Sequence, residues 1–498
     1  MKYRSVFGVL LAAALLLSAG RVHALTLAAG ADNIAYLPVH QMGYTGKGVI
    51  TGVIDLMFPN PNHATFYVSA DNHASRVTRM SLYGGDAGYG IGHANAVAGV
   101  LAGRGKGDGT YLGVAPQAEV WAASCSGDET SIRQAFLDFT SSDAQGRRCQ
   151  VFVMSLAAFI PDNGVYPFVQ FLDWLAVNRG AFLSFGTAQA GGSVAIPGGN
   201  YNQLTVGGLD QALQHVSSTS GTGPTPDGRS KPDVVAPSTN LYLPDHTGVD
   251  NWYRNPGSYP SVAAPFGAGV AALLRQYGDN HAFTWDVRVI KSVILNSATK
   301  LPGWTHTETQ PLDNAQGAGR INALRAIYQY AAGKQSPGNV QSAGWDLDNV
   351  TNHAMKLYHM TEKVPAGSTV VATLDWFRYT APIDDNLLGY FWITTKFEDL
   401  NLYLYRDSDC ALVARSVSAV DSVEHIYYRL AEEDTYTLAV GLLGGGNRIE
   451  TYGLSWWTEV PEPGSLTLFA LGFTAAAGLI RRRTLSARRA SPPSSIRI

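Results

Sequence analysis

The sequence predicts an α/β domain, with a parallel sheet covered by helices on both faces, followed by a small antiparallel β-sandwich domain. In the first part of the chain, short apolar runs alternate with helical patterns, as in parallel sheets that pack between helices. The expected strands are 49–54, 151–156, 181–185 and 204–207, and the expected helices are 131–140, 167–177 and 285–296. Between about 335 and 459 the pattern changes. Runs such as 374–377, 400–405 and 436–440 are rich in aromatic and β-branched residues and are separated by turns, which is typical of a β-sandwich.

Composition excludes some classes of protein. The chain has 36 basic and 39 acidic residues, a formal net charge of −3 and no long basic stripe outside its ends. This argues against nucleic acid as a partner. The three cysteines, Cys125, Cys149 and Cys410, are too few for a disulfide scaffold, although pairing of Cys125 with Cys149 in an oxidising periplasm stays open. No zinc-type cluster is visible.

The first 24 residues predict export. Lys2 and Arg4 precede the apolar run 6–19, and Val22-His23-Ala24 forms a small-residue cleavage site. These are the parts of a secretory signal peptide that is cut after Ala24. A membrane helix is the alternative, and it is weaker because the run is short.

Ser261 is the most informative residue. It stands at the start of 260–274, a segment made almost entirely of small and apolar residues. Free backbone N–H groups and the positive end of the dipole lie at a helix start. This setting suits a nucleophile whose attack generates an oxyanion. The alternative is a core helix with a serine N-cap.

Two further segments supply partners for a serine nucleophile. The segment 91–103 is a second helix of small residues, with His93 near its start, and 48–55 is a short apolar strand that ends in Asp55. Functional side chains gather beyond the carboxyl ends of parallel strands. A structural histidine, and an aspartate that serves a turn or a helix cap, are the alternatives.

These segments resemble those of subtilases, the subtilisin-like serine peptidases. The family writes them as Val-Ile-Asp-Thr-Gly, His-Gly-Thr-His-Val-Ala-Gly and Gly-Thr-Ser-Met-Ala-Ala-Pro, and the chain order Asp55, His93, Ser261 is the subtilisin order. The run 227–237 matches the family's Gly-Arg-x-Lys-Pro-Asp-Val-Val-Ala-Pro. The resemblance extends over roughly 34–333, so we expect a subtilase-like catalytic domain at 25–334.

The resemblance implies a role for each residue of the triad. Ser261 would attack a carbonyl, His93 would accept and return the proton, and Asp55 would orient the imidazole. The segment Ser155, Leu156 and Ala157 resembles the substrate-binding Ser-Leu-Gly of the family, with a methyl group added at Ala157. Calcium is common in the family, and a structural calcium is compatible with the resemblance. The sequence shows no ligand set and no other cofactor.

Several positions depart from the family pattern. The oxyanion hole normally combines the backbone of the serine with an asparagine amide, and Gln189 is the candidate here, with a surface-loop glutamine as the alternative. Leu56, Met57, Ala94, Asn95, Pro260 and Val262 also replace usual family residues. We expect no long inhibitory propeptide before residue 35.

The end of the chain predicts sorting. Val460-Pro461-Glu462-Pro463-Gly464-Ser465 precedes the apolar segment 466–480 and three arginines, and the segment 460–483 resembles the PEP-CTERM signal of Gram-negative bacteria. This implies recognition by an exosortase and transient insertion in the membrane, with a plain membrane anchor as the alternative. The basic, Ser- and Pro-rich tail 484–498 reads as disordered.

Together, these observations predict a secreted, surface-sorted serine endopeptidase that acts on peptide or protein substrates at the cell surface, in the periplasm or outside the cell. The alternative is a catalytically impaired surface or binding protein that keeps the fold, which Gln189, Ala157 and the missing propeptide favour. The β-sandwich at 335–459 would support folding, capture substrate or bind a surface. Trp456 and Trp457 are either ligand-binding aromatics or strand core.

Overall fold

The computed structural model describes residues 28–30, 32–88, 92–106, 110–187, 192–245, 253–255, 257–389, 391–444 and 447–460. The expected signal peptide at 1–24, Gln189, and all but the first residue of the sorting segment and tail lie outside these residues. Within them, no helix is long and apolar enough to cross a membrane.

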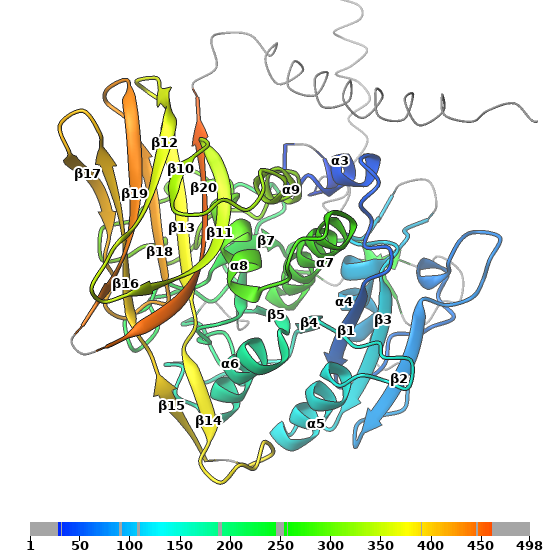
Figure 1. Cartoon of the computed structure of the whole chain (residues 1–498). Coiled ribbons are helices and arrows are strands. Elements are labelled where there is room, and N and C mark those ends of the chain that lie inside the picture. Colours follow the sequence, from blue (N-terminus) through cyan, green and yellow to red (C-terminus); the bar gives the residue numbers. More distant parts are fainter. Residues whose placement is uncertain are drawn as a thin grey trace, which may run out of the picture.

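A seven-stranded parallel sheet forms the centre of the first domain (Figure 1). Its strand order is β2-β3-β1-β4-β5-β6-β7. The strands are β1 (Ile50–Asp55), β2 (Val77–Tyr83), β3 (Glu119–Cys125), β4 (Val151–Met154), β5 (Phe182–Gly186), β6 (Leu204–Leu209) and β7 (Val234–Pro237). Because all of the strands run the same way, their carboxyl ends meet at one edge of the sheet, where functional residues gather in such folds.

Helices cover both faces of this sheet. The helical elements are α3 (Tyr36–Gln41), η1 (Ala64–Phe66), α4 (His93–Ala102), α5 (Glu129–Thr140), α6 (Pro167–Arg179), η2 (Pro260–Val262), α7 (Ala264–His281), α8 (Val287–Asn296) and α9 (Ala323–Ala331). In β1, Val53 belongs to the core that contains α4 and α7, and Ile54 belongs to the core that contains α5 and α6. Successive side chains of a strand point to opposite faces, so one short apolar run fills two cores. The predicted fold class is confirmed.

The second domain consists of two facing sheets of mostly antiparallel strands. One has the order β10-β12-β19-β16-β17 and the other β11-β20-β13-β18. Their strands are β10 (Gly338–Val340), β11 (Ala343–Thr351), β12 (Lys356–Val364), β13 (Thr369–Trp376), β16 (Asp399–Arg406), β17 (Ala411–Ser416), β18 (Val423–Arg429), β19 (Asp434–Leu443) and β20 (Ile449–Glu459). Side chains from both sheets share one core, and Trp456 is fully buried in it. The ligand-binding alternative for Trp456 is therefore wrong.

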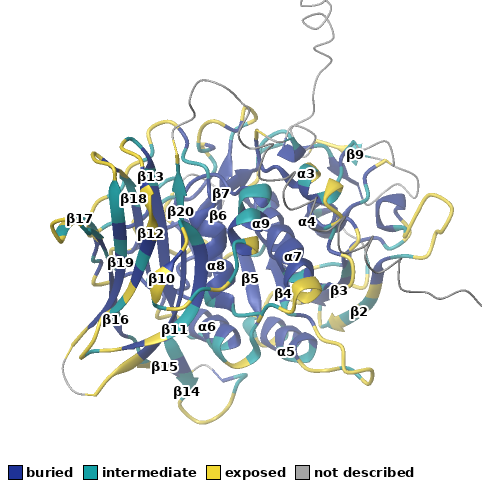
Figure 2. Ribbon diagram, turned by 45° about the horizontal axis from the view of Figure 1, so that its top comes forward, coloured by how far each residue is buried: buried dark blue, intermediate teal, exposed yellow. Residues whose placement is uncertain are grey.

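The two domains pack closely against each other. Helix α8 contacts β13 and β20 and is buried along nearly its whole length (Figure 2). The ammonium of Lys291 on α8 lies 2.9 Å from the Asp375 carboxylate on β13, and both side chains are buried. A buried ion pair of this kind is costly to separate, because each partner would leave an unpaired charge. The sandwich is thus firmly attached to the first domain.

A hairpin leaves the sandwich and reaches the first domain. It is formed by β14 (Tyr379–Pro382) and β15 (Trp392–Lys396), which lie against α6 (Figure 1). Its root is fixed by Arg378, whose guanidinium forms a buried ion pair with Asp173 of α6. No local sequence pattern predicted this contact.

Cys125 and Cys149 are buried, free thiols in the structure. Cys125 Sγ lies 3.8 Å from the carbonyl oxygen of Ser131. Cys149 is buried in the core between the sheet and the helices α5 and α6. The disulfide between Cys125 and Cys149 that the sequence left as a possibility is therefore not formed in this structure.

Candidate active site

Asp55 and His93 are brought together at the carboxyl edge of the sheet. Asp55 is the last residue of β1, and His93 is the first residue of α4. His93 Nδ1 lies 2.7 Å from Asp55 Oδ2, and the backbone N–H of Leu56 donates to Asp55 Oδ1 at 2.7 Å. The carboxylate therefore holds the imidazole in one orientation. A role for Asp55 in a turn or a helix cap would not account for the contact of its carboxylate with His93.

A glycine shapes the approach to this pair. Gly92 caps α4 with φ 83°, a left-handed conformation that a residue without Cβ adopts at little cost. The chain can therefore turn into α4 immediately before His93, whose side chain contacts Asp55 at the end of β1. The small residues that follow are buried against the sheet and α7.

The environment of His93 tunes its basicity. Its side chain is 31% exposed, whereas that of Asp55 is 5% exposed. Burial disfavours the protonated imidazole, but the charge of Asp55 and the hydrogen bond to it favour it. Together they raise the pKa of His93 above its ordinary value of 6.5.

Ser261 lies in the short turn η2, immediately before α7. The sequence suggested that Ser261 opens the helix, but α7 begins at Ala264, with Pro265 in its first turn. Proline is favoured there because its missing N–H has no helical partner. No side-chain hydrogen bond caps either η2 or α7. The N-cap alternative for Ser261 is therefore wrong.

The turn that carries Ser261 contacts α4, β5 and β6. Ser155, which follows β4, donates its hydroxyl to the carbonyl oxygen of Ser261 at 2.7 Å. A Cβ atom added to Gly186, the last residue of β5, would lie 2.9 Å from the carbonyl oxygen of Pro260 and 3.5 Å from Ser261 Cα. Gly186 thus permits close approach of the serine turn to the sheet. Among the described residues, no hydrogen bond joins His93 to Ser261, and such bonds are often long before substrate binds.

Asn95 is a residue whose role the sequence did not reveal. It is fully buried, its Oδ1 accepts from the backbone N–H of Asn60 and its Nδ2 donates to the carbonyl oxygen of Asp245 at 2.9 Å. Asn95 therefore joins two loops to the helix of His93. A polar residue among the small, apolar residues of this helix is the feature of the sequence that could have indicated this role.

An apolar cavity of about 270 Å³ opens beside the end of β4. Two residues of the segment that resembles the family's substrate-binding segment, Leu156 and Ala157, line this cavity. Its third residue, Ser155, contacts the serine turn. Other lining side chains come from the end of β1, from α5 and α6 and from the loop before β6, and include Leu56, Glu129, Ile132, Phe168 and Ile196. Apolar walls with few polar groups are typical of sites that bind an apolar side chain.

Gln189, the candidate amide of the oxyanion hole, lies outside the described residues. Within the described part of the chain, no group of three or more His, Cys, Asp or Glu residues gathers in a cluster that would hold a metal ion. We therefore place no calcium site.

A model of the subtilase family matches residues 46–319, which are more than half of the 498 residues. The chain belongs to the subtilase family. The matched range includes Asp55, His93 and Ser261. A PEP-CTERM protein-sorting motif matches residues 459–483. The chain is therefore a subtilase-family protein that carries a signal for export and for surface or extracellular sorting.

The relatives match over limited lengths. Serine protease AprX of Bacillus subtilis is 29% identical over 160 residues, which are 27% of this chain and 32% of AprX. Bacillopeptidase F of the same organism is 28% identical over 160 residues, 32% of this chain and 10% of that protein. Pyrolysin of Pyrococcus furiosus is 33% identical over 109 residues, 22% of this chain and 8% of pyrolysin. The chain thus spans about a third or less of the length of these relatives.

One solved structure matches part of the chain. The prenylagaramide maturation protease PagA is 18% identical, with a TM-score of 0.47, and covers 59% of this chain and 98% of its own.

Proposed function

We propose that this subtilase is a secreted serine endopeptidase in which Asp55, His93 and Ser261 form the catalytic triad. The observation that carries the proposal is the 2.7 Å hydrogen bond between Asp55 and His93, at the sheet edge where the Ser261 turn contacts the helix of His93. Oriented imidazole and a nearby hydroxyl are the two requirements for an activated serine.

In this mechanism, Ser261 Oγ attacks the carbonyl carbon of a peptide bond while His93 Nε2 accepts the hydroxyl proton. The C–N bond then breaks, and His93 returns the proton to the leaving amine, which leaves an acyl-Ser261 enzyme. Water attacks the acyl carbon and gives a proton to His93. The acid is released, and Ser261 regains its proton. Asp55 stays ionised and stabilises the imidazolium in both halves of the reaction.

The oxyanion needs donors that are fixed before the reaction. We assign the backbone N–H of Ser261 and the side-chain amide of Gln189 to this role. Loss of one such donor typically lowers kcat by roughly 10²–10³. A glutamine carries the amide on a side chain that is one methylene longer than that of asparagine. How well Gln189 stabilises the oxyanion therefore depends on whether its amide N–H lies at hydrogen-bond distance from the oxyanion.

We also infer that the apolar cavity binds a large apolar side chain on the acyl side of the scissile bond. Leu156 and Ala157 lie along the cavity and Ser155 contacts the serine turn, so this segment runs from the nucleophile to the cavity. A peptide that pairs with the segment places one of its side chains in the cavity. Burying an aliphatic or aromatic side chain contributes about 1.5–3 kcal/mol.

The sorting motif supplies the destination. We infer that exosortase-type machinery processes the chain near Pro461 and Glu462 after transient insertion of 466–480 in the membrane. The mature enzyme then acts on peptide or protein substrates at or outside the cell surface.

The test is cleavage of an unfolded protein by wild type and by Ser261→Ala, with mapping of the new N-termini. We expect cleavage by wild type only, with large apolar residues concentrated at one position before the cut. Ser258→Ala is the matched control, because Ser258 lies in the same loop and bonds to Thr239 instead. Equal products from wild type and Ser261→Ala would refute the role of Ser261. No products from folded wild type would refute the proposal and favour a binding protein.

A further inference from the structure

We propose that Trp392, a residue of the β-sandwich domain, positions the wall of the apolar cavity and so helps to select large apolar side chains of the substrate. The inference rests on the proposed function. It makes the second domain a part of substrate recognition, through a hairpin that reaches the catalytic domain. Trp392 is a positioning residue, since it acts through the side chains that line the cavity.

Trp392 is inserted in the core of the first domain. It is 6% exposed and belongs to the apolar core that contains α5 and α6. Its ring meets Phe171 edge to face at 5.7 Å and Trp174 edge to face at 6.3 Å. The indole N–H donates to the carbonyl oxygen of Gly389 at 3.0 Å, so the polar end of the ring is satisfied within its own hairpin.

From Trp392, two short paths of contact lead to the cavity. On α6, Phe171 stacks with Phe168 at 6.4 Å, and Phe168 lines the cavity. On α5, the fully buried guanidinium of Arg133 lies 5.5 Å from the Trp392 ring and 5.6 Å from the Phe168 ring. Arg133 Nη2 also lies 3.4 Å from the carboxylate of Glu129, another lining residue. Both helical walls of the cavity therefore rest on the same aromatic cluster.

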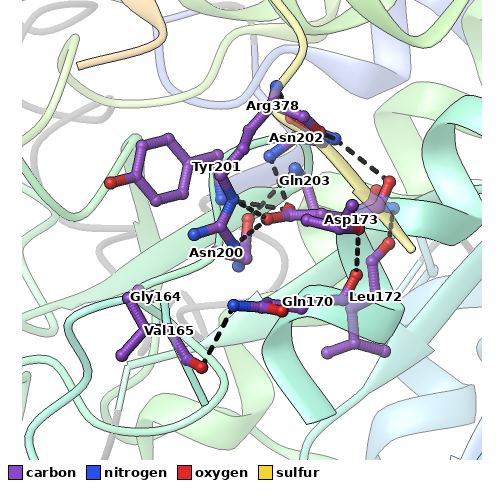
Figure 3. Close-up of polar contacts among 12 residues, drawn as sticks. Gly164, Val165, Gln170, Leu172, Asp173, Asn200, Tyr201, Asn202, Gln203 and Arg378 are labelled. Carbon is purple, nitrogen blue, oxygen red and sulfur yellow. Dashed lines mark hydrogen bonds and ion pairs between the residues drawn. The ribbon is translucent and has the colours of Figure 1, made fainter. Parts of the chain in front are cut away.

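The root of the hairpin is fixed in a way that holds Trp392 in place. Figure 3 shows Arg378 against Asp173, with Asn202 bonded to the backbone of Arg378 in both directions. The Thr380 hydroxyl donates to the carbonyl oxygen of Gln170, and Gln170 Nε2 donates to the carbonyl oxygen of Val165. Val165 adjoins Tyr166, which lines the cavity. The hairpin thus braces α6 and the loop before it.

Removing the indole would leave a void behind Phe171 and Phe168. Close-packed cores collapse only partly around such a void, so Phe168 would lose the support that sets the cavity's depth. Ground-state and transition-state contacts with the substrate side chain would weaken together, which raises KM and leaves kcat unchanged. We expect about a tenfold fall in kcat/KM for a substrate with a large apolar residue in the cavity, within the range that pocket shape usually controls.

The experiment compares wild type, Trp392→Ala, Trp392→Phe and Ile393→Ala on a pair of peptide anilides. The pair carries phenylalanine or alanine at the position where wild type prefers large apolar residues. Ile393 is the matched control because it is the next residue of the same strand and is 47% exposed. We expect Trp392→Ala to lose selectivity through KM, Trp392→Phe to restore most of it, and Ile393→Ala to match wild type. Unchanged selectivity in Trp392→Ala would overturn the proposal.

A second measurement does not depend on catalysis. Hydrogen exchange of residues 157–168 should be faster in Trp392→Ala than in Ile393→Ala, and equal exchange in the two variants would overturn the proposal. If Trp392→Ala does not fold, Arg133→Met takes its place, because it removes the cation from the same cluster. Arg133→Met should change exchange and selectivity in the same direction, and no change in either would overturn the proposal. Absence of cleavage by wild type would refute the proposed function, and the exchange comparison would still decide the role of Trp392.

Discussion

Asp55 Oδ2 accepts a hydrogen bond from His93 Nδ1 at 2.7 Å, and the Asp55 carboxylate is almost fully buried. This arrangement fixes the tautomer of His93, so that Nε2 is the nitrogen left to accept a proton. The Asp55–His93 pair is the part of the proposed triad that the geometry defines most fully.

The first prediction concerns Asp55. Asp55→Asn keeps the shape of the side chain but favours the wrong tautomer and removes the negative charge. We expect kcat to fall by about 10⁴, as in other enzymes of this mechanism. Hydrolysis of a peptide anilide measures it, with Asp86→Asn as the control at an aspartate whose carboxylate accepts a hydrogen bond from the backbone N–H of Gly88. A fall of less than tenfold would contradict the role assigned to Asp55.

The second prediction is a pH dependence. His93 must be neutral to accept the serine proton, and Asp55 raises the pKa of His93 above 6.5. The value of kcat/KM should therefore rise with pH along a limb whose midpoint lies above 6.5. In Asp55→Asn the carboxylate no longer favours the imidazolium, and the midpoint should move to lower pH. A wild-type midpoint below 6.5 would contradict this account.

The third prediction concerns Gly186. In Gly186→Ala, the new Cβ would lie 2.9 Å from the carbonyl oxygen of Pro260 and would push on the serine turn. We expect kcat to fall about 10²-fold, because small displacements of reacting groups are costly. Gly192→Ala is the control, since no atom of the residues that the structure describes lies within 4 Å of its added Cβ. Full activity in Gly186→Ala would show that the turn adapts freely.

The central strands of the sheet could be predicted from the sequence, and the strands beside them could not. The strands β1, β4, β5 and β6 were predicted because each is a short, mostly apolar run, and nearly all of their residues are buried, as is typical of parallel strands covered on both faces. Strand β2 was missed because it is an edge strand whose side chains alternate between inside and outside, and β3 was missed because small residues dominate it.

The candidate site divides in the same way. The sequence could nominate Asp55, His93 and Ser261 as candidates because each stands in a short segment of characteristic residues. It could not nominate Gly186 and Trp392, because their roles depend on contacts with segments that lie far away along the chain. The start of α7 at Ala264 follows from Pro265, a signal that the sequence contained.

The fourth prediction concerns the domain interface. Arg378→Ala would leave the buried carboxylate of Asp173 without its cation. We expect the free energy of unfolding to fall by about 3 kcal/mol, in the range for a broken buried ion pair. The control is Arg415→Ala, which breaks the exposed pair of Arg415 with Glu308 and should cost about 0.5 kcal/mol. Denaturant unfolding of both variants measures the difference, and equal effects would contradict the assignment.

The fifth prediction is a pH dependence of stability at His425. Burial, together with the nearby Lys300 and His306, holds the pKa of His425 well below 6.5. Below pH 6.5 the unfolded chain takes up a proton that the folded chain does not, so stability is present at higher pH and lost as the pH falls.

We therefore expect wild type to lose up to about 1.4 kcal/mol more than His425→Gln for each pH unit below 6.5. Denaturant unfolding at pH 7.5, 6 and 5 tests this, with His353→Gln as the control at an exposed histidine of the same domain. Parallel pH profiles for wild type and His425→Gln would refute the assignment.

Activation of Ser261 is tested most directly by the reaction of the folded protein with a fluorophosphonate, followed by peptide mapping. We expect one adduct, on Ser261, which is absent in Ser261→Ala and strongly reduced in Asp55→Asn. A folded wild-type protein that forms no adduct at Ser261 would contradict the triad and the proposed activity with it.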